Sequence, residues 1–295
     1  MLPTLSPRQL ARAIDASESS VKRWADEGLI SAHRTAGGHR RIPRHEAVRF
    51  VRATGISVLD PGVLGLAEAP ATSLEPAEDD AERLFAALNA SERGLAIGRI
   101  HSWFLAGRSP AEIFDGPLRT AMVRIGTQWE DSPDGIVVEH VATGICAEAI
   151  GRIRAALPPA ADDAPVAVGG APTDDPYILP SLTAATVLHD LGMKAVNLGP
   201  DTPLPALPTA AAREGAAVVW LSVSSEAVVE DVRTALPELA DRLARLGTEL
   251  VVGGRVHERL RPMRRPHLTF VSTLAELAAF ARGLMSPARS PTDRG

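Results

Sequence analysis

Apolar residues recur at helical spacing up to about residue 156, and the pattern changes to short apolar runs from residue 165 onward. In the first segment Leu, Ile and Ala return every three or four positions, which is typical of amphipathic helices. In the second segment five apolar runs alternate with helical stretches. Such alternation predicts a doubly wound parallel sheet within an α/β multidomain chain. The expected strands are 166–170, 195–198, 217–223, 250–252 and 268–271.

Breaks in composition divide the chain into parts. Residues 56–77, a short Pro- and Ala-rich stretch at 157–165, and a tail at 286–295 have no sustained period, so we expect linkers and a frayed end there. The predicted organisation is a head at residues 1–55, a four-helix bundle at 78–157 and the α/β domain at 165–285. Within the bundle, the helices are expected to break at 89–91, 107–110 and 131–135.

The head has the pattern of two short helices followed by a hairpin. Ser6, Pro7 and Gln9 form a capping-box start for the first helix. The second helix is expected over 18–27, and Gly37-Gly38 between alternating residues predicts a hairpin within 29–43. A third helix begins near Arg44. Two helices joined by a tight turn and followed by a hairpin predict a winged helix-turn-helix domain.

Charge supports a polyanion as the partner of this head. Residues 1–53 carry ten Lys or Arg against five acidic residues, although the whole chain has a net charge of −5. A basic head on an acidic chain is typical of nucleic-acid binding. The alternative is a solvated basic surface. The candidate DNA-contacting residues are Ser19, Ser20, Lys22 and Arg23 on the second helix and Arg34, His39, Arg40 and Arg41 on the hairpin.

Other features exclude whole classes of protein. A single cysteine, Cys146, excludes an internal disulfide framework and a multi-cysteine metal site. No apolar run approaches the roughly 20 residues that a membrane-spanning helix needs. The first residues lack the pattern of a secretory signal. We therefore expect a cytoplasmic protein without membrane partners.

Two segments of the head carry a specific resemblance. They read SPRQLARAIDASESSVKRWADEGLI and RTAGGHRRIPRHEAV. Together they resemble the N-terminal DNA-binding domain of the MerR family of transcriptional regulators over about 50 residues. The resemblance implies binding to a double-stranded DNA operator as a homo-oligomer, a dimer or a tetramer. No heptad pattern follows the head, so the dimerisation coiled coil typical of that family is not expected here.

The bundle contains Trp129, followed after nine residues by Glu139 and His140. An antiparallel pair of helices could bring the three together at one end of the bundle, but taken alone the residues fit better with a core Trp beside two solvated polar side chains. The surrounding segment, VRIGTQWEDSPDGIVVEHVATGI, resembles the helical cap of cobalamin-binding, light-responsive MerR-type regulators of the CarH/LitR type. That resemblance implies that Trp129, Glu139 and His140 face the upper side of adenosylcobalamin.

The last domain extends this resemblance. The segments WLSVS and VVGG resemble two signatures of the Rossmann-like cobalamin-binding module. In that module the serines, here Ser222 and Ser224, line a slot for the buried nucleotide tail. Gly253 and Gly254 would let the tail pass close to the backbone. Ordinary Ser and Gly at strand ends are the alternative.

One signature of the module is altered. The module should carry Asp/Glu-x-His-x-x-Gly after its first strand, with the His as the lower ligand of cobalt. Asp175 is present, but Tyr177 replaces the His and Pro180 replaces the Gly. A neutral phenol, with a pKa near 10, is a much poorer ligand than imidazole. In light-responsive relatives a His can follow the Trp, and here that residue is Glu130.

The sequence therefore predicts a non-enzymatic, sequence-specific transcriptional regulator with a cobalamin-type sensory domain that responds to light or to a ligand. Cobalamin would bind without a protein His below cobalt, or not at all. A corrinoid-binding enzyme subunit is an alternative, since a bundle paired with a Rossmann-like domain occurs there too. A constitutive DNA-binding regulator whose sensory domain no longer binds cobalamin is another.

Overall fold

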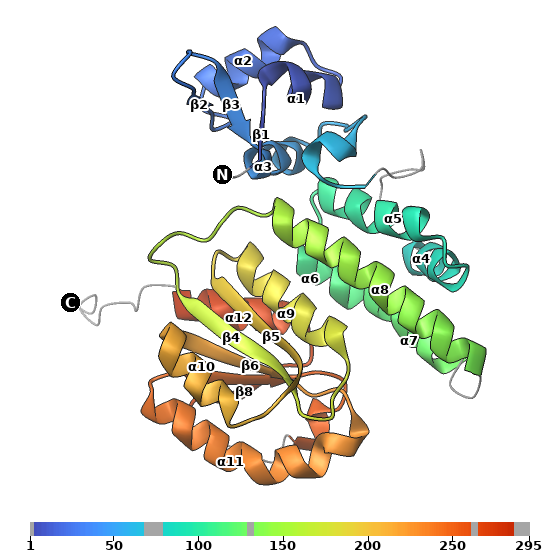
Figure 1. The fold of residues 1–295 in the computed structure, drawn as a ribbon, viewed down its shortest axis with the longest axis vertical. Coiled ribbons are helices and arrows are strands. Elements are labelled where there is room, and N and C mark those ends of the chain that lie inside the picture. Colours follow the sequence, from blue (N-terminus) through green and yellow to red (C-terminus); the bar gives the residue numbers. More distant parts are fainter. Residues whose placement is uncertain (1–2, 68–78, 129–132, 261–264, 286–295) are drawn as a thin grey trace, which may run out of the picture. The chain divides into compact units, whose positions relative to one another are not determined.

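The computed structural model describes residues 3–67, 79–128, 133–260 and 265–285 (Figure 1). Trp129, Glu130, residues 68–77 of the expected linker and the expected tail lie outside these ranges. The chain forms two compact units, Met1–Pro159 and Ala160–Gly295. The head and the bundle expected from the sequence thus belong to one unit, and the sheet belongs to the other.

The first unit begins with three helices and a small antiparallel sheet. Ser6 caps the first helix, because its hydroxyl accepts the Gln9 N–H and its own N–H donates to the Gln9 side chain. In the hairpin turn, Gly38 takes a positive φ of 77°, whereas Gly37 does not. The strand order is β1-β3-β2. The elements are β1 (Thr4–Leu5), α1 (Pro7–Ala13), α2 (Glu18–Asp26), β2 (His33–Arg34), β3 (Arg40–Pro43) and α3 (Arg44–Thr54).

The segment after α3 is packed where the sequence suggested a linker. It forms a short 3-10 helix, η1 (Pro61–Leu64), and buries Leu64 and Leu66. The backbone N–H groups of Leu59 and Asp60 both donate to the carbonyl of Ala13 at the end of α1. Two buried leucines and two backbone bonds hold residues 59–66 on the head, so the linker prediction is wrong for this part of 56–77.

The bundle has the expected helices, with one irregularity. The stretch predicted as one helix from Pro110 is interrupted at Phe114–Leu118, where a π-helical turn contains the non-helical Gly116 and Pro117. Proline lacks an N–H and disrupts the regular ladder. Of the break expected at 131–135, residues 133–135 already belong to α8, and residues 131 and 132 lie outside the described residues. The helices are α4 (Asp80–Asn89), α5 (Arg93–Leu105), α6 (Pro110–Ile113), α7 (Arg119–Gln128) and α8 (Pro133–Ala156).

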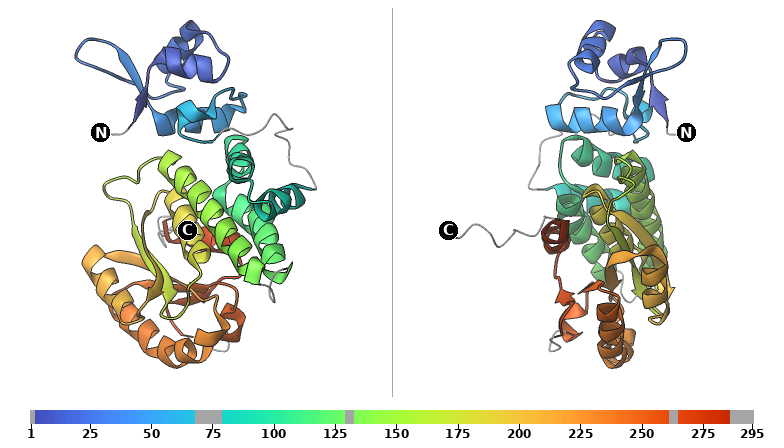
Figure 2. Two further views of the ribbon diagram at one scale, coloured as in Figure 1. Left: turned by 45° about the vertical axis from the view of Figure 1, so that its right-hand side comes forward. Right: turned by 90° about the vertical axis from the view of Figure 1, so that its left-hand side faces the viewer.

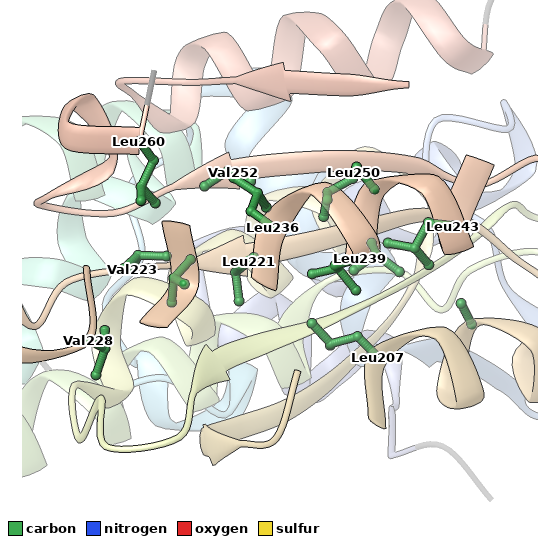
Figure 3. Close-up of a cluster of buried hydrophobic side chains, with 14 of the residues drawn as sticks. Leu207, Leu221, Val223, Val228, Leu236, Leu239, Leu243, Leu250, Val252 and Leu260 are labelled. Carbon is green, nitrogen blue, oxygen red and sulfur yellow. The ribbon is translucent and has the colours of Figure 1, made fainter. Parts of the chain in front are cut away.

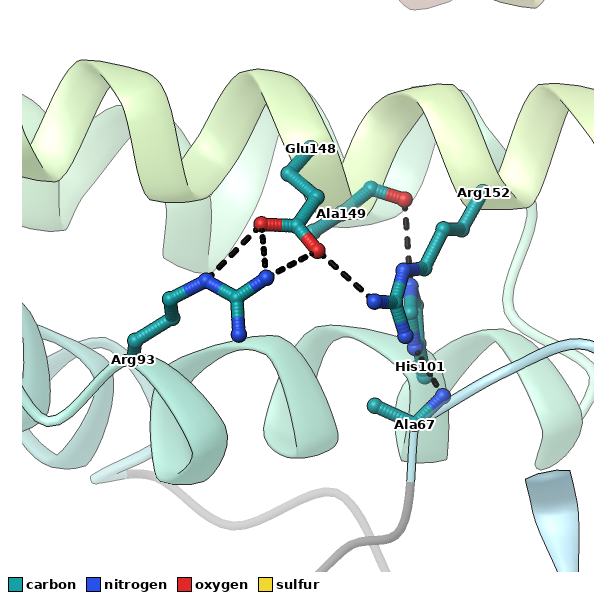
Figure 4. Close-up of polar contacts among 6 residues, drawn as sticks. All are labelled: Ala67, Arg93, His101, Glu148, Ala149 and Arg152. Carbon is teal, nitrogen blue, oxygen red and sulfur yellow. Dashed lines mark hydrogen bonds and ion pairs between the residues drawn. The ribbon is translucent and has the colours of Figure 1, made fainter.

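A buried histidine joins three segments of this unit (Figure 4). The imidazole of His101, on α5, is fully buried. Its Nδ1 accepts the N–H of Ala67 at 2.8 Å, and its Nε2 lies 3.1 Å from the carbonyl oxygen of Ala149 on α8. Beside it, Glu148 pairs with Arg93 and Arg152. Burial lowers the pKa of His101 to about 4, so the ring is neutral and donates from Nε2.

The second unit is a parallel sheet of strand order β5-β4-β6-β7-β8. Helices cover both faces (Figures 1 and 2), which confirms the predicted doubly wound sheet. The strands are β4 (Val166–Pro172), β5 (Lys194–Thr202), β6 (Ala216–Ser222), β7 (Glu249–Gly253) and β8 (Leu268–Phe270). The helices are α9 (Ile178–Asp190), α10 (Ala206–Glu214), η3 (Glu226–Val228), α11 (Val229–Arg245), η4 (His257–Leu260) and α12 (Leu274–Met285).

Two apolar clusters hold this sheet between its helices. On one face, Leu207 of α10 and Leu236, Leu239 and Leu243 of α11 pack on the strands (Figure 3). On the other face the small residues of α9 and Leu277 of α12 pack around Trp220 of β6. Strands buried on both faces explain the continuous apolar runs in the sequence. Among the described residues, no helix combines the length and hydropathy required to cross a bilayer.

We predict that the protein becomes less stable as the pH is lowered, because His101 is buried in its neutral form. Its pKa is 6.5 in the unfolded chain and about 4 in the folded one, so the unfolded state binds the proton more readily below pH 6.5. Stability is therefore lost as the pH falls from about 6.5 towards 4, by about 2 kcal/mol between about pH 7.5 and pH 5. Urea unfolding followed by circular dichroism across this range measures the loss.

The variant His101→Asn, which cannot take up a proton, should lose most of this pH dependence. His39→Asn serves as the matched control, because His39 is exposed on the hairpin. A His101→Asn profile that parallels the unmodified protein from about pH 6.5 to pH 5 would show that His101 is not the titrating group.

Candidate functional site

The carboxyl edge of the sheet is the place where a doubly wound fold forms its crevice. β4 lies between β5 and β6, so the chain leaves β4 towards one face and enters β6 from the other. The segments that follow β4 and β6 therefore meet at this edge. They contain Asp175, Tyr177 and Ser224, and Ser222 is the last residue of β6. The sequence had selected all four residues.

Asp175 binds these two segments together. Its side chain is fully buried. Its Oδ2 accepts the backbone N–H groups of Ser224 at 2.6 Å and Ser225 at 3.0 Å, and its Oδ1 accepts the N–H of Tyr177 at 3.3 Å. A buried carboxylate is stable when several N–H groups satisfy it. Asp175 thus holds the segment after β4 against the segment after β6.

Tyr177 is contacted by an arginine that sequence reasoning missed. The Nε of Arg255 donates to the carbonyl of Ser224 at 3.1 Å, and its terminal nitrogen lies 3.4 Å from the Tyr177 hydroxyl. The guanidinium carbon lies 5.1 Å from the centre of the Tyr177 ring, within cation–π range. The feature of the sequence that could have identified Arg255 is its place directly after Gly253-Gly254.

The two glycines are required by the packing of the protein itself. Gly254 has a φ of 100°, and a Cβ there would lie 2.3 Å from the carbonyl oxygen of Val223. A Cβ on Gly253 would lie 3.2 Å from the side chain of Val271. The packing of Gly254 against Val223 thus accounts for a glycine there without any ligand, and the expectation that both glycines leave room for a nucleotide tail stays a prediction.

These residues do not fit a corrinoid held from below by the protein. The side chain at the lower-ligand position is a phenol that interacts with Arg255. Pro180, at the position of the expected Gly, lies in the first turn of α9. Nearby His257 is buried, with Nδ1 2.7 Å from the carbonyl oxygen of Gly254 and Nε2 3.3 Å from the Ser272 hydroxyl. Both of its ring nitrogens are thus already bonded.

A metal site of another kind is not present in the described parts of the chain. There, no group of three or more His, Cys, Asp or Glu side chains is placed to hold an ion. Burial raises the pKa of the Cys146 thiol to about 12, so the thiol stays protonated and is a poor ligand.

In the bundle, the predicted cap residues lie on the first turns of α8. Glu139 is half-buried and His140 is exposed. The Nδ1 of His140 lies 2.8 Å from the carbonyl oxygen of Ile136 one turn earlier. Ile136 and Val137 are also exposed. Since Trp129 lies outside the described residues, its expected grouping with Glu139 and His140 stays a prediction.

In the head, two of the four candidate residues of α2 lie in its first turn and the other two further along the helix. The hydroxyls of Ser19 and Ser20 each lie 2.8 Å from that of Ser17, which caps the helix. Lys22 and Arg23 are exposed. Their ion pairs, to Glu18 and Glu27, are local and solvated, so they are weak.

On the hairpin the basic residues differ in exposure and in their bonding partners. Arg34 and His39 are exposed, and Arg41 is half-buried. Arg34 donates to the carbonyl of Gly38 across the turn at 3.2 Å. Arg40 forms an ion pair with Asp26 of α2, and this pair attaches the hairpin to that helix.

Comparison with known proteins gives a likeness in structure. No family model and no curated protein matches the sequence. The chain resembles the monomethylamine corrinoid protein of Methanosarcina barkeri, with 17% identity, a TM-score of 0.55, and coverage of 70% of this chain and 99% of that one. At this identity, the likeness shows the fold, an α/β fold with a parallel five-stranded sheet.

Two further matches have lower TM-scores. A cobalamin-binding protein from Desulfitobacterium hafniense DCB-2 matches with 15% identity and a TM-score of 0.36, over 70% of this chain and 98% of that one. The methanol:cobalamin methyltransferase complex of Methanosarcina barkeri matches with 15% identity and a TM-score of 0.33, over 72% of this chain and 81% of that one.

We predict that Asp175→Asn lowers the stability of the second unit by about 1–3 kcal/mol. The Asn side chain has one oxygen that accepts hydrogen bonds and an NH2 group that only donates. It therefore cannot satisfy the three N–H groups that both oxygens of Asp175 accept, and at least one buried N–H group loses its partner. Asp163→Asn, on an exposed residue before β4, removes the same charge and should cost less than about 0.5 kcal/mol. The urea midpoints of the two variants give the comparison. Equal midpoints would mean that Asp175 does not hold the two segments together.

Proposed function

We propose that the chain is a sequence-specific, DNA-binding transcriptional regulator. The observation that carries the proposal is the set of basic side chains on α2 and the β2–β3 hairpin of a head whose first 53 residues have net positive charge. Short helices that pack together and a basic hairpin suit a winged helix-turn-helix domain. The resemblance of this segment to MerR regulators supports the same function.

Each group of residues has a role in this proposal. Ser19, Lys22 and Arg23 enter the major groove, where hydroxyl and cationic groups reach base edges. Arg34 and Arg41 follow the phosphates, which supply most of the salt-dependent affinity. Arg40 keeps the hairpin fixed to α2 through Asp26, which makes it a positioning residue.

The chain works as a homo-oligomer without enzymatic activity of its own. Regulators of this type read two-fold symmetric operators, so at least two copies must bind. The remaining parts of the chain set the state of the oligomer in response to a ligand. A signal acts in this way when it binds one state more tightly than the other.

A second candidate function is a corrinoid-carrying subunit that serves a methyltransferase. The observation in its favour is the structural likeness to a corrinoid protein, which covers 99% of that protein. The basic head has no role in this alternative, and an arginine-bound phenol replaces the expected cobalt ligand. DNA binding in the absence of any corrinoid separates the two functions.

We predict that the double variant Arg34→Ala/Arg41→Ala binds duplex DNA more weakly at every sequence. Loss of two phosphate contacts should reduce the slope of log affinity against log salt concentration by about 2. Fluorescence anisotropy with a labelled duplex over a series of salt concentrations measures both effects. Arg213→Ala/Arg245→Ala is the matched control, because it removes the same charge from exposed positions of the second unit. If both double variants show the same slope, the hairpin does not contact phosphate.

We also predict that the DNA-bound form is at least a dimer. A footprint on a selected operator should cover two half-sites separated by about one helical turn, roughly 34 Å, or a multiple of it. Footprinting together with sedimentation of the complex gives the span and the number of copies. A single protected half-site occupied by one copy of the chain would contradict the proposed assembly.

A further inference from the structure

Trp220 occupies an unusual position in the second unit. It lies in the middle of the sheet, on β6, in register with Gly169 of the neighbouring β4. A Cβ on Gly169 would lie 2.2 Å from the Trp220 ring, so the indole lies directly against the backbone of β4. The side chain is 2% exposed and belongs to the cluster beneath α9 and α12. The ring thus fills the space between β4 and α9.

A chain of hydrogen bonds fixes the indole there. Its Nε1 donates to the hydroxyl of Ser181 on α9 at 3.0 Å. Ser181 in turn donates to the Asn197 side chain on β5 at 2.7 Å, and the same oxygen accepts the N–H of Gly199 at 3.1 Å. A buried indole needs a partner for its N–H, and here the partner belongs to the helix that covers the ring. The ring therefore joins β6, α9 and β5.

The face of β6 that carries this ring is the face that the resemblance assigns to a ligand slot. The residue two positions further along β6 is Ser222, which points to the same face as Trp220 because side chains alternate along a strand. In the cobalamin-binding module that this segment resembles, the serine at the position of Ser222 lines the slot for the nucleotide tail. Cobalamin's tail ends in benzimidazole, a bicyclic aromatic group of nearly the same size as indole.

We propose that Trp220 fills the slot for the nucleotide tail and that, together with Tyr177 and Arg255, it excludes corrinoids from this edge of the sheet. Trp220 occupies the buried part of the slot. At the opening, the guanidinium of Arg255 covers the ring of Tyr177 and bonds to the carbonyl of Ser224. Close-packed interiors leave no room for a second bicyclic group beside the first. The proposal concerns the second unit and does not depend on DNA binding.

The direct test mixes the purified full chain with hydroxocobalamin, or with adenosylcobalamin in the dark, and then removes unbound corrinoid by desalting. The unmodified protein is expected to show no visible absorbance and no shift of its melting temperature. Corrinoid retained at one equivalent per chain would overturn the proposal.

Three variants separate the contributions of the residues. Tyr177→His restores an imidazole but keeps the slot filled, so it should still retain no corrinoid. Tyr177→His/Trp220→Val opens the slot as well, and its affinity should rise at least roughly tenfold. Tyr177→His/Trp220→Phe is the matched control, because phenylalanine fills most of the same space. Retention by Tyr177→His alone, or none by a folded Tyr177→His/Trp220→Val, would contradict the role of Trp220.

A second measurement is made on the unmodified protein. The indole N–H of Trp220, buried and bonded to Ser181, should exchange slowly with solvent in an NMR spectrum of the indole resonances. Trp220→Phe assigns the resonance, because the signal disappears. The exchange rate should be the same with and without excess hydroxocobalamin. Faster exchange on addition would show that a corrinoid displaces the ring.

The corrinoid experiments and the DNA experiments test the two proposals independently. Protein that retains a coloured corrinoid would contradict the exclusion of corrinoids, whatever its affinity for DNA. Loss of the proposed regulator function would appear as absent DNA binding by a colourless, folded chain. Each result thus points to one unit of the molecule.

Discussion

The buried carboxylate of Asp175 is the interaction on which the carboxyl edge of the sheet depends. Parallel strands end together at this edge, and their following segments expose backbone N–H groups that need partners. Asp175 supplies acceptors to both segments at once. Because Ser224 is held by this bond, its carbonyl is in place to accept Arg255, and Arg255 in turn covers Tyr177. One carboxylate thus organises the residues that decide what the edge can bind.

Much of the fold follows from local rules that the sequence displays. The strands of the second unit are apolar runs because both faces of the sheet are covered. Ser6 and Ser109 begin helices through capping boxes whose partners lie three residues further on. Gly38 marks the hairpin because its φ is positive. These features depend on neighbours within a few residues, and so they can be predicted from the sequence.

The features that could not be predicted depend on residues far apart in the chain. Arg255 meets Tyr177 across 78 residues, and Trp220 meets Ser181 across 39. Neither pair has a spacing that a local pattern reveals. Leu64 and Leu66 looked like part of a linker because their pattern is too short to show a period, yet both are buried. The sequence could identify the positions of the candidate site, but the partners of those positions came from the structure.

The two proposals together make the chain a regulator that binds DNA through its basic head and that admits no corrinoid at the carboxyl edge of its sheet. The most direct test is selection of duplexes from a random-sequence pool by the purified full chain, with no corrinoid added. The account predicts enrichment of an inverted repeat over successive rounds, since a symmetric oligomer reads two half-sites. Recovered sequences no more enriched than those obtained with residues 160–295 alone would contradict it.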